Sequence, residues 1–81
     1  MEIKVLGMGC ARCHDLERRV RQALEETGRT ADVEKVEDIQ KIMAFRVMAT
    51  PGLVIDGIVK STGRLPGLDE IKGWIQETPA S

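Results

Sequence analysis

Apolar residues recur along this chain in patterns that change from strand-like to helix-like and back. The run EIKVL at positions 2–6 is rich in β-forming residues, and Gly7 and Gly9 then interrupt it. From about residue 11 to residue 27 the apolar positions fall three and four apart, the spacing of one helix face. That face holds Cys13, Leu16, Val20, Ala23, Leu24 and Thr27. Gly28 suits the position after such a helix, where φ is often positive.

Residues 30–37 return to a partial alternation that predicts a second strand, with apolar residues at Ala31, Val33 and Val36. A strand that follows a crossover helix should lie parallel to the first strand and be reached by a right-handed connection. Asp38 is placed to cap a second helix over residues 39–46. The apolar stripe of that helix would be Ile39, Ile42 and Met43.

Two β-branched runs in the second half flank a turn sequence. LVI (53–55) and IVK (58–60) are separated by Asp56-Gly57, a strong signal for a β-hairpin. Apolar residues then recur at helical spacing over residues 67–77, at Leu68, Ile71, Trp74 and Ile75. The predicted order is therefore β-α-β-α-β-β-α, an α/β fold with a four-stranded mixed sheet flanked by helices. We place one domain at residues 1–78 and a frayed tail at residues 79–81.

The charge pattern argues against a nucleic-acid partner. The formal net charge is −1, and the basic residues are dispersed among acidic ones. Nucleic-acid binders concentrate positive charge and often use aromatic platforms, whereas the aromatic residues here are Phe45 and Trp74. No apolar run approaches the roughly 20 residues of a membrane span, and the first six residues do not resemble a signal peptide. We therefore expect a cytoplasmic protein without a membrane partner.

Both cysteines lie at the turn between the first strand and the first helix, in GMGCARCHDL (7–16). Cys10 would sit at the helix N-terminus, where unpaired N–H groups and the helix dipole favour a thiolate. Cys13, three residues further on, would bring its sulfur back over the first. Such a pair is suited to disulfide exchange, in which Cys10 attacks a substrate and Cys13 then attacks Cys10 to release the product.

The same sulfurs could instead hold a metal ion. Soft thiolates select copper(I) or zinc, and Met8 and His14 stand close to the pair in the sequence. A complete zinc site takes four ligands, whereas the chain has two cysteines and one histidine. Zinc binding would need a second copy or outside ligands, so the local string leaves redox and metal chemistry both open.

Over nearly its whole length the chain resembles the thioredoxin superfamily, and within it the small thioredoxin- and glutaredoxin-like proteins. The matching features are Cys10-Ala-Arg-Cys13 opening a long helix, Thr50-Pro51 opening a hairpin, Val54-Ile55-Asp56-Gly57, and Gly63 before the last helix. The resemblance implies a redox-active disulfide, with Cys10 as the nucleophile and Cys13 as the resolving cysteine. It also implies a cis peptide bond before Pro51, which faces that disulfide, and a substrate chain that pairs with the backbone of Thr50.

Three places depart from the family pattern. Gly9 and Ala11-Arg12 replace the aromatic residue of thioredoxins and the Pro-Tyr of glutaredoxins. Lys4 stands where thioredoxins have a buried acidic residue, six positions before the first cysteine. Gly63-Arg64 stands where glutaredoxins have a Gly-Gly pair. The departures concern redox potential, proton transfer and glutathione recognition, and they leave both sulfurs and the proline in place.

The string GMGCARC also resembles the G-M-x-C-x-x-C motif of heavy-metal-associated domains. Those domains run β-α-β-β-α-β and finish on a strand, whereas this chain finishes on a predicted helix. Thr50-Pro51 has no counterpart in them. The order of elements therefore favours the thioredoxin-like interpretation over a soft-metal binding module.

We therefore predict a thiol–disulfide oxidoreductase whose catalytic residues are Cys10 and Cys13. Thr50, Pro51 and Arg12 are the predicted substrate-binding residues, and the positive charge of Arg12 would favour acidic partners. The expected partners are a disulfide-containing protein and an upstream reductant, either a reductase or a small thiol. We expect a monomer that needs neither a cofactor nor a bound metal for the exchange.

Overall fold

All the predicted strands and helices occur in the computed structural model, which describes residues 1–7, 11–47 and 49–78. In chain order they are β1 (Glu2–Leu6), α1 (Ala11–Thr27), β2 (Asp32–Val36), α2 (Ile39–Ala44), β3 (Gly52–Ile55), β4 (Ile58–Thr62) and α3 (Leu68–Glu77). The predicted order and the α/β class are confirmed, while the expected tail at 79–81 lies outside the described residues. Within the described ranges, no helix combines the length and apolar character needed to cross a bilayer.

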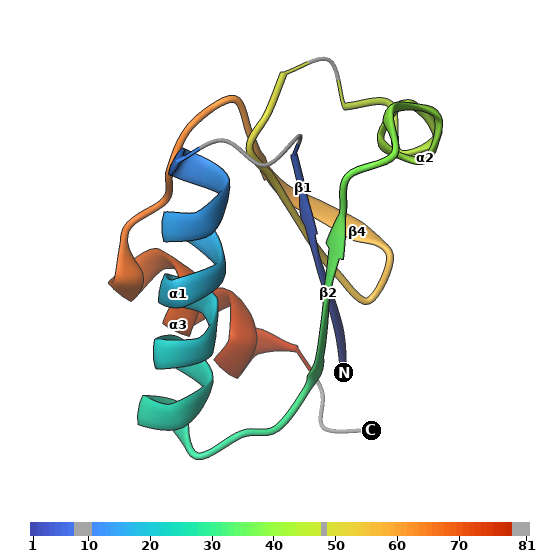
Figure 1. The fold of residues 1–81 in the computed structure, drawn as a ribbon. Coiled ribbons are helices and arrows are strands. Elements are labelled where there is room, and N and C mark those ends of the chain that lie inside the picture. The colour runs from blue at the N-terminus through green and yellow to red at the C-terminus, as the bar shows by residue number, and fades with distance from the viewer. Residues whose placement is uncertain (8–10, 48, 79–81) are drawn as a thin grey trace.

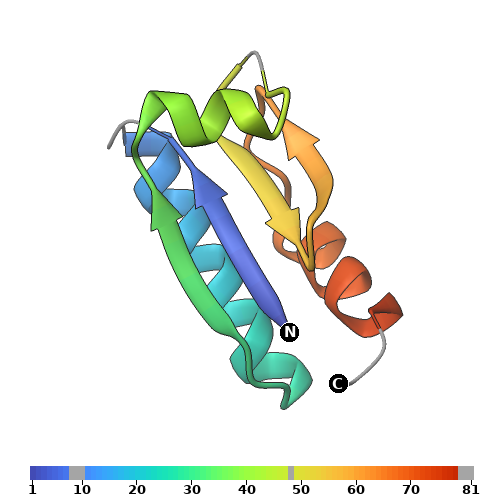
Figure 2. The same cartoon turned by 90° about the vertical axis from the view of Figure 1, so that its right-hand side faces the viewer.

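The four strands form one mixed sheet in the order β2-β1-β3-β4 (Figure 2). β1 and β2 are parallel, as the helix between them predicts, and β3 pairs antiparallel with both β1 and β4. Asp56 and Gly57 both have positive φ, 49° and 81°, as a tight two-residue hairpin turn requires. Val54 faces Val59 but Leu53 faces Ser61, so β4 carries one extra residue, a bulge, at this point.

The larger core lies between the sheet and the helices α1 and α3, which cover the same face (Figure 1). β1 and β3 each direct alternate residues toward these helices, and α1 supplies the apolar face that its spacing predicts. The cluster comprises Ile3, Val5, Leu53 and Ile55 from the strands, and Leu16, Val20, Ala23, Leu24, Ile71 and Ile75 from the helices. The side chains of Arg19 and Arg29 donate to the carbonyl oxygens of Pro66 (2.8 Å) and Ile75 (2.5 Å), which ties α1 to α3 and the loop before it.

The opposite face of the sheet carries α2, which buries less of its apolar stripe and ends earlier than the sequence predicts. Asp38 caps the helix as expected, accepting a hydrogen bond from the N–H of Gln40 at 2.8 Å. Of the predicted apolar stripe, however, Ile42 alone is buried, whereas Ile39 is 58% and Met43 65% exposed. A helix of six residues makes fewer than two turns, so it brings a single apolar position onto the sheet. The helix also ends before the predicted residue 46, because Arg46 has φ 60°.

The loop between β4 and α3 is held by an ion pair. The two terminal guanidinium nitrogens of Arg64, Nη1 and Nη2, donate to the carboxylate of Glu70 at 3.1 and 2.7 Å. Glu70 also accepts from the N–H of Gly67 at 3.3 Å, which satisfies a donor at the start of α3. The hydrogen bonds from Arg64, and then that from Gly67, lower the pKa of Glu70 below its ordinary 4.5.

We expect truncation of Ile3 to cost far more stability than truncation of Ile39. Ile3 is fully buried, so Ile3→Ala removes contacts and leaves a cavity, with an expected loss of about 2–5 kcal/mol in the free energy of unfolding. Ile39→Ala, at an exposed site, should change it by about 0.5 kcal/mol or less. Chemical denaturation of the two variants measures both values, and equal losses would contradict the described core.

The Glu70 interactions predict a pH-dependent contribution to stability. A carboxyl group whose pKa is lowered by folding stabilises the protein above its unfolded-state pKa, and this contribution is lost as pH falls through the folded-state value. Glu70→Gln should therefore be less stable than wild type near neutral pH, and the difference should disappear in acid. Thermal unfolding across this pH range is the measurement, with Glu25→Gln on α1 as the control. A difference that persists unchanged in acid would contradict the assignment.

Candidate active site

Cys13 lies on the first turn of α1, at the end of the sheet where β1 finishes (Figure 1). Its spacing to Leu16 and Val20 places it on the apolar face of the helix, and the side chain is only 2% exposed. The sequence prediction that Cys13 belongs to this buried face is confirmed. Cys10 and Met8 lie outside the described residues, so the position of the second sulfur stays a prediction.

Gly7 is the backbone element against which Cys13 packs. The alternation of β1 directs Ile3 and Val5 toward α1, and residue 7 points the same way. An ideal Cβ built on Gly7 would overlap Cys13 Sγ and would lie 3.0 Å from Cys13 Cβ. The sulfur of Cys13 therefore occupies the volume that a side chain at position 7 would need. From the sequence, Gly7 is expected to end the first strand and to form part of the GMGCARC string, whereas its contact with Cys13 follows from the alternation of positions 3, 5 and 7.

Pro51, the residue before β3, lies beside Gly7, the residue after β1. Leu6 pairs with Gly52 in the antiparallel register of β1 and β3, so the next residues outward are Gly7 and Pro51. The Thr50–Pro51 peptide bond is cis, Pro51 is buried, and its carbonyl accepts from the N–H of Gly63 at 2.9 Å. The structure thus brings Cys13 and Pro51, far apart in sequence, to one end of the sheet. Thr50 is exposed at this end, where an approaching chain can reach it.

A small polar cluster links the N-terminal half of α1 to β2. His14 and Arg12, on either side of Cys13 in α1, are both exposed. The ammonium group of Lys35 lies 3.2 Å from His14 Nδ1 and 3.7 Å from a carboxylate oxygen of Glu17. This contact of Lys35 could not be expected from the sequence, because it depends on how β2 lies against α1.

Lys4, which replaces the buried acidic residue of typical thioredoxins, points away from Cys13. Neighbouring Val5 faces α1, so Lys4 faces α2 instead. Its ammonium group lies 5.4 Å from the centre of the Phe45 ring, a cation–π contact with the residue that follows α2. Lys4 is therefore half-buried on the other face of the sheet.

The described residues do not assemble a metal centre. Among residues 1–7, 11–47 and 49–78, no three His, Cys, Asp or Glu side chains gather closely enough to hold an ion. His14, the one histidine of the chain, directs Nδ1 at Lys35. The soft-metal alternative therefore gains no further ligand for Cys13 from this part of the chain.

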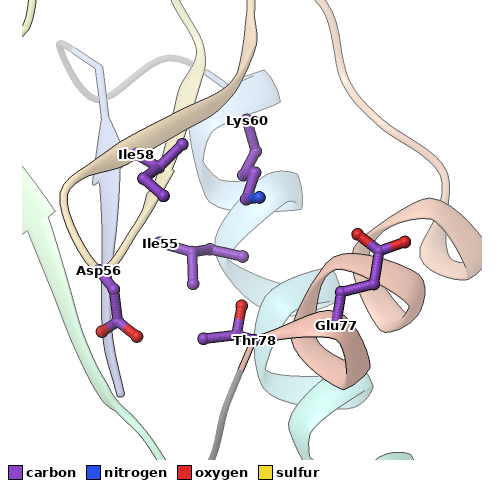
Figure 3. Close-up of a pocket in the computed structure, with 6 residues that line it drawn as sticks. All are labelled: Ile55, Asp56, Ile58, Lys60, Glu77 and Thr78. Atoms are coloured by element: carbon purple, nitrogen blue, oxygen red, sulfur yellow. The ribbon is translucent and has the colours of Figure 1, made fainter.

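A separate cavity of about 270 Å³ lies at the other end of the sheet (Figure 3). It is lined by Ile55, Asp56, Ile58, Lys60, Glu77 and Thr78. These residues belong to the β3–β4 turn region and the end of α3, and β3 runs toward them from the Pro51 end. The cavity is therefore remote from Cys13 and takes no part in the sulfur site.

Comparison with known proteins agrees with the fold and the site. A family model described as a thioredoxin domain matches residues 1–76. The chain is 40% identical over 72 residues to a thioredoxin of Methanothermobacter thermautotrophicus, covering 89% of this chain and 94% of that protein. It is 36% identical over 70 residues to a thioredoxin of Methanocaldococcus jannaschii, covering 86% of this chain and 80% of that protein. The chain therefore belongs to the thioredoxin superfamily, and its activity is thiol–disulfide exchange.

Proposed function

We propose that Cys10 is the attacking cysteine of the exchange and Cys13 the resolving one. The burial of Cys13 is the observation that supports this division of roles. A sulfur that is 2% exposed cannot meet a disulfide on another protein without local opening, so the first attack falls to Cys10. Cys13 is suited to the second, internal attack, which needs only access to the neighbouring cysteine.

The two steps conserve atoms and electrons. The Cys10 thiolate attacks one sulfur of the substrate disulfide, forms a mixed disulfide, and releases the other substrate sulfur as a thiolate that takes up a proton. Cys13, after losing its proton, attacks Cys10 Sγ and displaces the second substrate thiolate, which is protonated in turn. Two electrons pass from the protein to the substrate, and the protein is left with a Cys10–Cys13 disulfide.

The substrate-binding residues in this proposal are Thr50, Pro51 and Arg12. Exposed Thr50 would offer its backbone groups to an extended substrate chain beside the sulfurs, and buried Pro51 would form the wall behind them. Arg12, exposed between the cysteine positions, would attract acidic residues next to the substrate disulfide.

The partners follow from the chemistry. The substrate is a protein disulfide, and an upstream reductant, either a reductase or a small thiol, returns the Cys10–Cys13 disulfide to the dithiol. We place the protein in the cytoplasm, where thiols are kept reduced, and propose that it acts as a monomer. The exchange itself takes no cofactor.

Serine substitutions of the two cysteines should give opposite results. Cys13→Ser should accumulate a mixed disulfide through Cys10, because the internal attack is lost while the first attack remains. Cys10→Ser should form no adduct and should not turn over. The measurement is to expose each variant to a cell extract, alkylate it rapidly, and identify reducible adducts by mass spectrometry. Adducts on Cys10→Ser, or none on Cys13→Ser, would contradict the assigned roles.

Neutralising Arg12 should slow the reaction with acidic substrates. Arg12→Gln should lower the rate with an acidic disulfide peptide by about threefold at about 0.1 M salt, where the Debye length is about 10 Å, and this effect should shrink as salt rises. The control is Arg21→Gln, an equal change of charge about 13 Å further along α1, beyond the Debye length at moderate salt. Stopped-flow rates with acidic and basic peptides make the comparison. Equal effects of the two substitutions would remove Arg12 from the substrate site.

A further inference from the structure

We propose that Gly7 is a positioning residue for Cys13, holding open the volume in which the resolving sulfur lies. This inference rests on the proposed roles of the two cysteines for its catalytic consequence. Its structural part depends only on the contact between Gly7 and Cys13. Because residue 7 has no side chain, Cys13 can be buried with its sulfur turned toward the end of β1.

The overlap at Gly7 has two components. A Cβ at position 7 would overlap Cys13 Sγ, and rotation about the Cys13 χ1 torsion could relieve that contact. The same Cβ would also lie 3.0 Å from Cys13 Cβ, which no side-chain rotation relieves. Alanine at position 7 therefore forces the sulfur to turn away and also requires the backbone of one element to shift.

Neither element is free to shift far. The N–H of Gly7 donates to the carbonyl oxygen of Val36 at 3.0 Å, which ties this end of β1 to β2. On the other side, α1 is fixed by Leu16 and Val20, both fully buried in the larger core. Because both backbones are held, we expect the Cys13 side chain to absorb most of the displacement. Its sulfur would then leave the sheet and become more accessible to solvent.

The other glycines supply matched controls. A Cβ on Gly52, in the adjacent strand at the same end of the sheet, would meet Leu6 Cδ1 and Val47 Cγ1 at 3.4 Å, ordinary packing distances. A Cβ on Gly73, within α3, would meet nothing within 4 Å. The severe overlap among these three positions is thus specific to Gly7, and Gly52→Ala adds the same methyl group without touching Cys13.

Alkylation of a single-cysteine protein tests the structural part. In the Cys10→Ser background Cys13 is the one remaining cysteine, and its rate of reaction with iodoacetamide reports its accessibility. Gly7→Ala should raise that rate by about tenfold, since a buried thiol becomes exposed. Gly52→Ala and Gly73→Ala should leave it within about twofold of the parent. Unchanged alkylation in a folded Gly7→Ala protein would overturn the proposal.

A double-mutant cycle separates this contact from a general loss of folding. Gly7→Ala should lower the melting temperature of the wild-type chain, and it should lower that of Cys13→Ala much less, because Sγ is then absent. A smaller loss should remain, because the Cβ of residue 13 is still there. Equal losses of melting temperature in the wild-type and Cys13→Ala chains would contradict the proposal, because the overlap with Cys13 Sγ would then contribute nothing to the loss.

The catalytic part is read from the reaction of the two-cysteine protein with 5,5′-dithiobis(2-nitrobenzoate). Cys10 releases one thionitrobenzoate in forming the mixed disulfide, and Cys13 releases the second. Gly7→Ala should slow the second release by about tenfold relative to the first, while Gly52→Ala should not. An unchanged ratio of the two rates would overturn the catalytic role of Gly7. In Cys13→Ser, the mixed disulfide between Cys10 and thionitrobenzoate should persist. If it does not, the proposed roles of the two cysteines are wrong, whatever the alkylation rates of Cys13 show.

Discussion

The burial of one face of α1 against β1 and β3 is the contact on which the site depends. Leu16 and Val20 can be buried beside Ile3 and Val5 only if α1 has one rotation about its axis. That rotation also turns Cys13, one helical turn before Leu16, toward the sheet. The hydrophobic energy of the core therefore fixes the orientation of a sulfur at its edge, and it places Arg12 and His14 on the outside.

Two consequences follow for the chemistry at this edge. Cys13 is enclosed by the end of β1, so its reaction with partners outside the molecule is disfavoured. Pro51 reaches the same place from the other direction, because β3 runs antiparallel to β1 and begins where β1 ends. The end of β1, the start of α1 and the loop before β3 thereby meet at one end of the sheet. This meeting is a product of topology, since the three segments are separated in the sequence.

Much of this arrangement could be predicted from the sequence, and the reasons for success and failure are physical. The long run of helical spacing in α1 and the Asp56-Gly57 turn sequence are local signals, and the helix and the turn both form where they are expected. Of the apolar stripe predicted for α2, Ile42 is buried whereas Ile39 and Met43 are exposed, since a helix of six residues presents few positions to the sheet. The contact between Lys35 and His14 depends on how a strand lies against a helix, which no local pattern encodes.

The bulge in β4 affects how the molecule behaves among its own copies. β2 and β4 are the two edges of the sheet, and a flat apolar edge is a template for strand pairing between molecules. β2 is protected by the charges of Asp32, Glu34 and Lys35. β4 has exposed Ile58 and Val59, but the extra residue, Lys60, distorts the hydrogen-bonding row beside them. The bulge that interrupts the β3–β4 ladder thus also disfavours strand pairing between molecules.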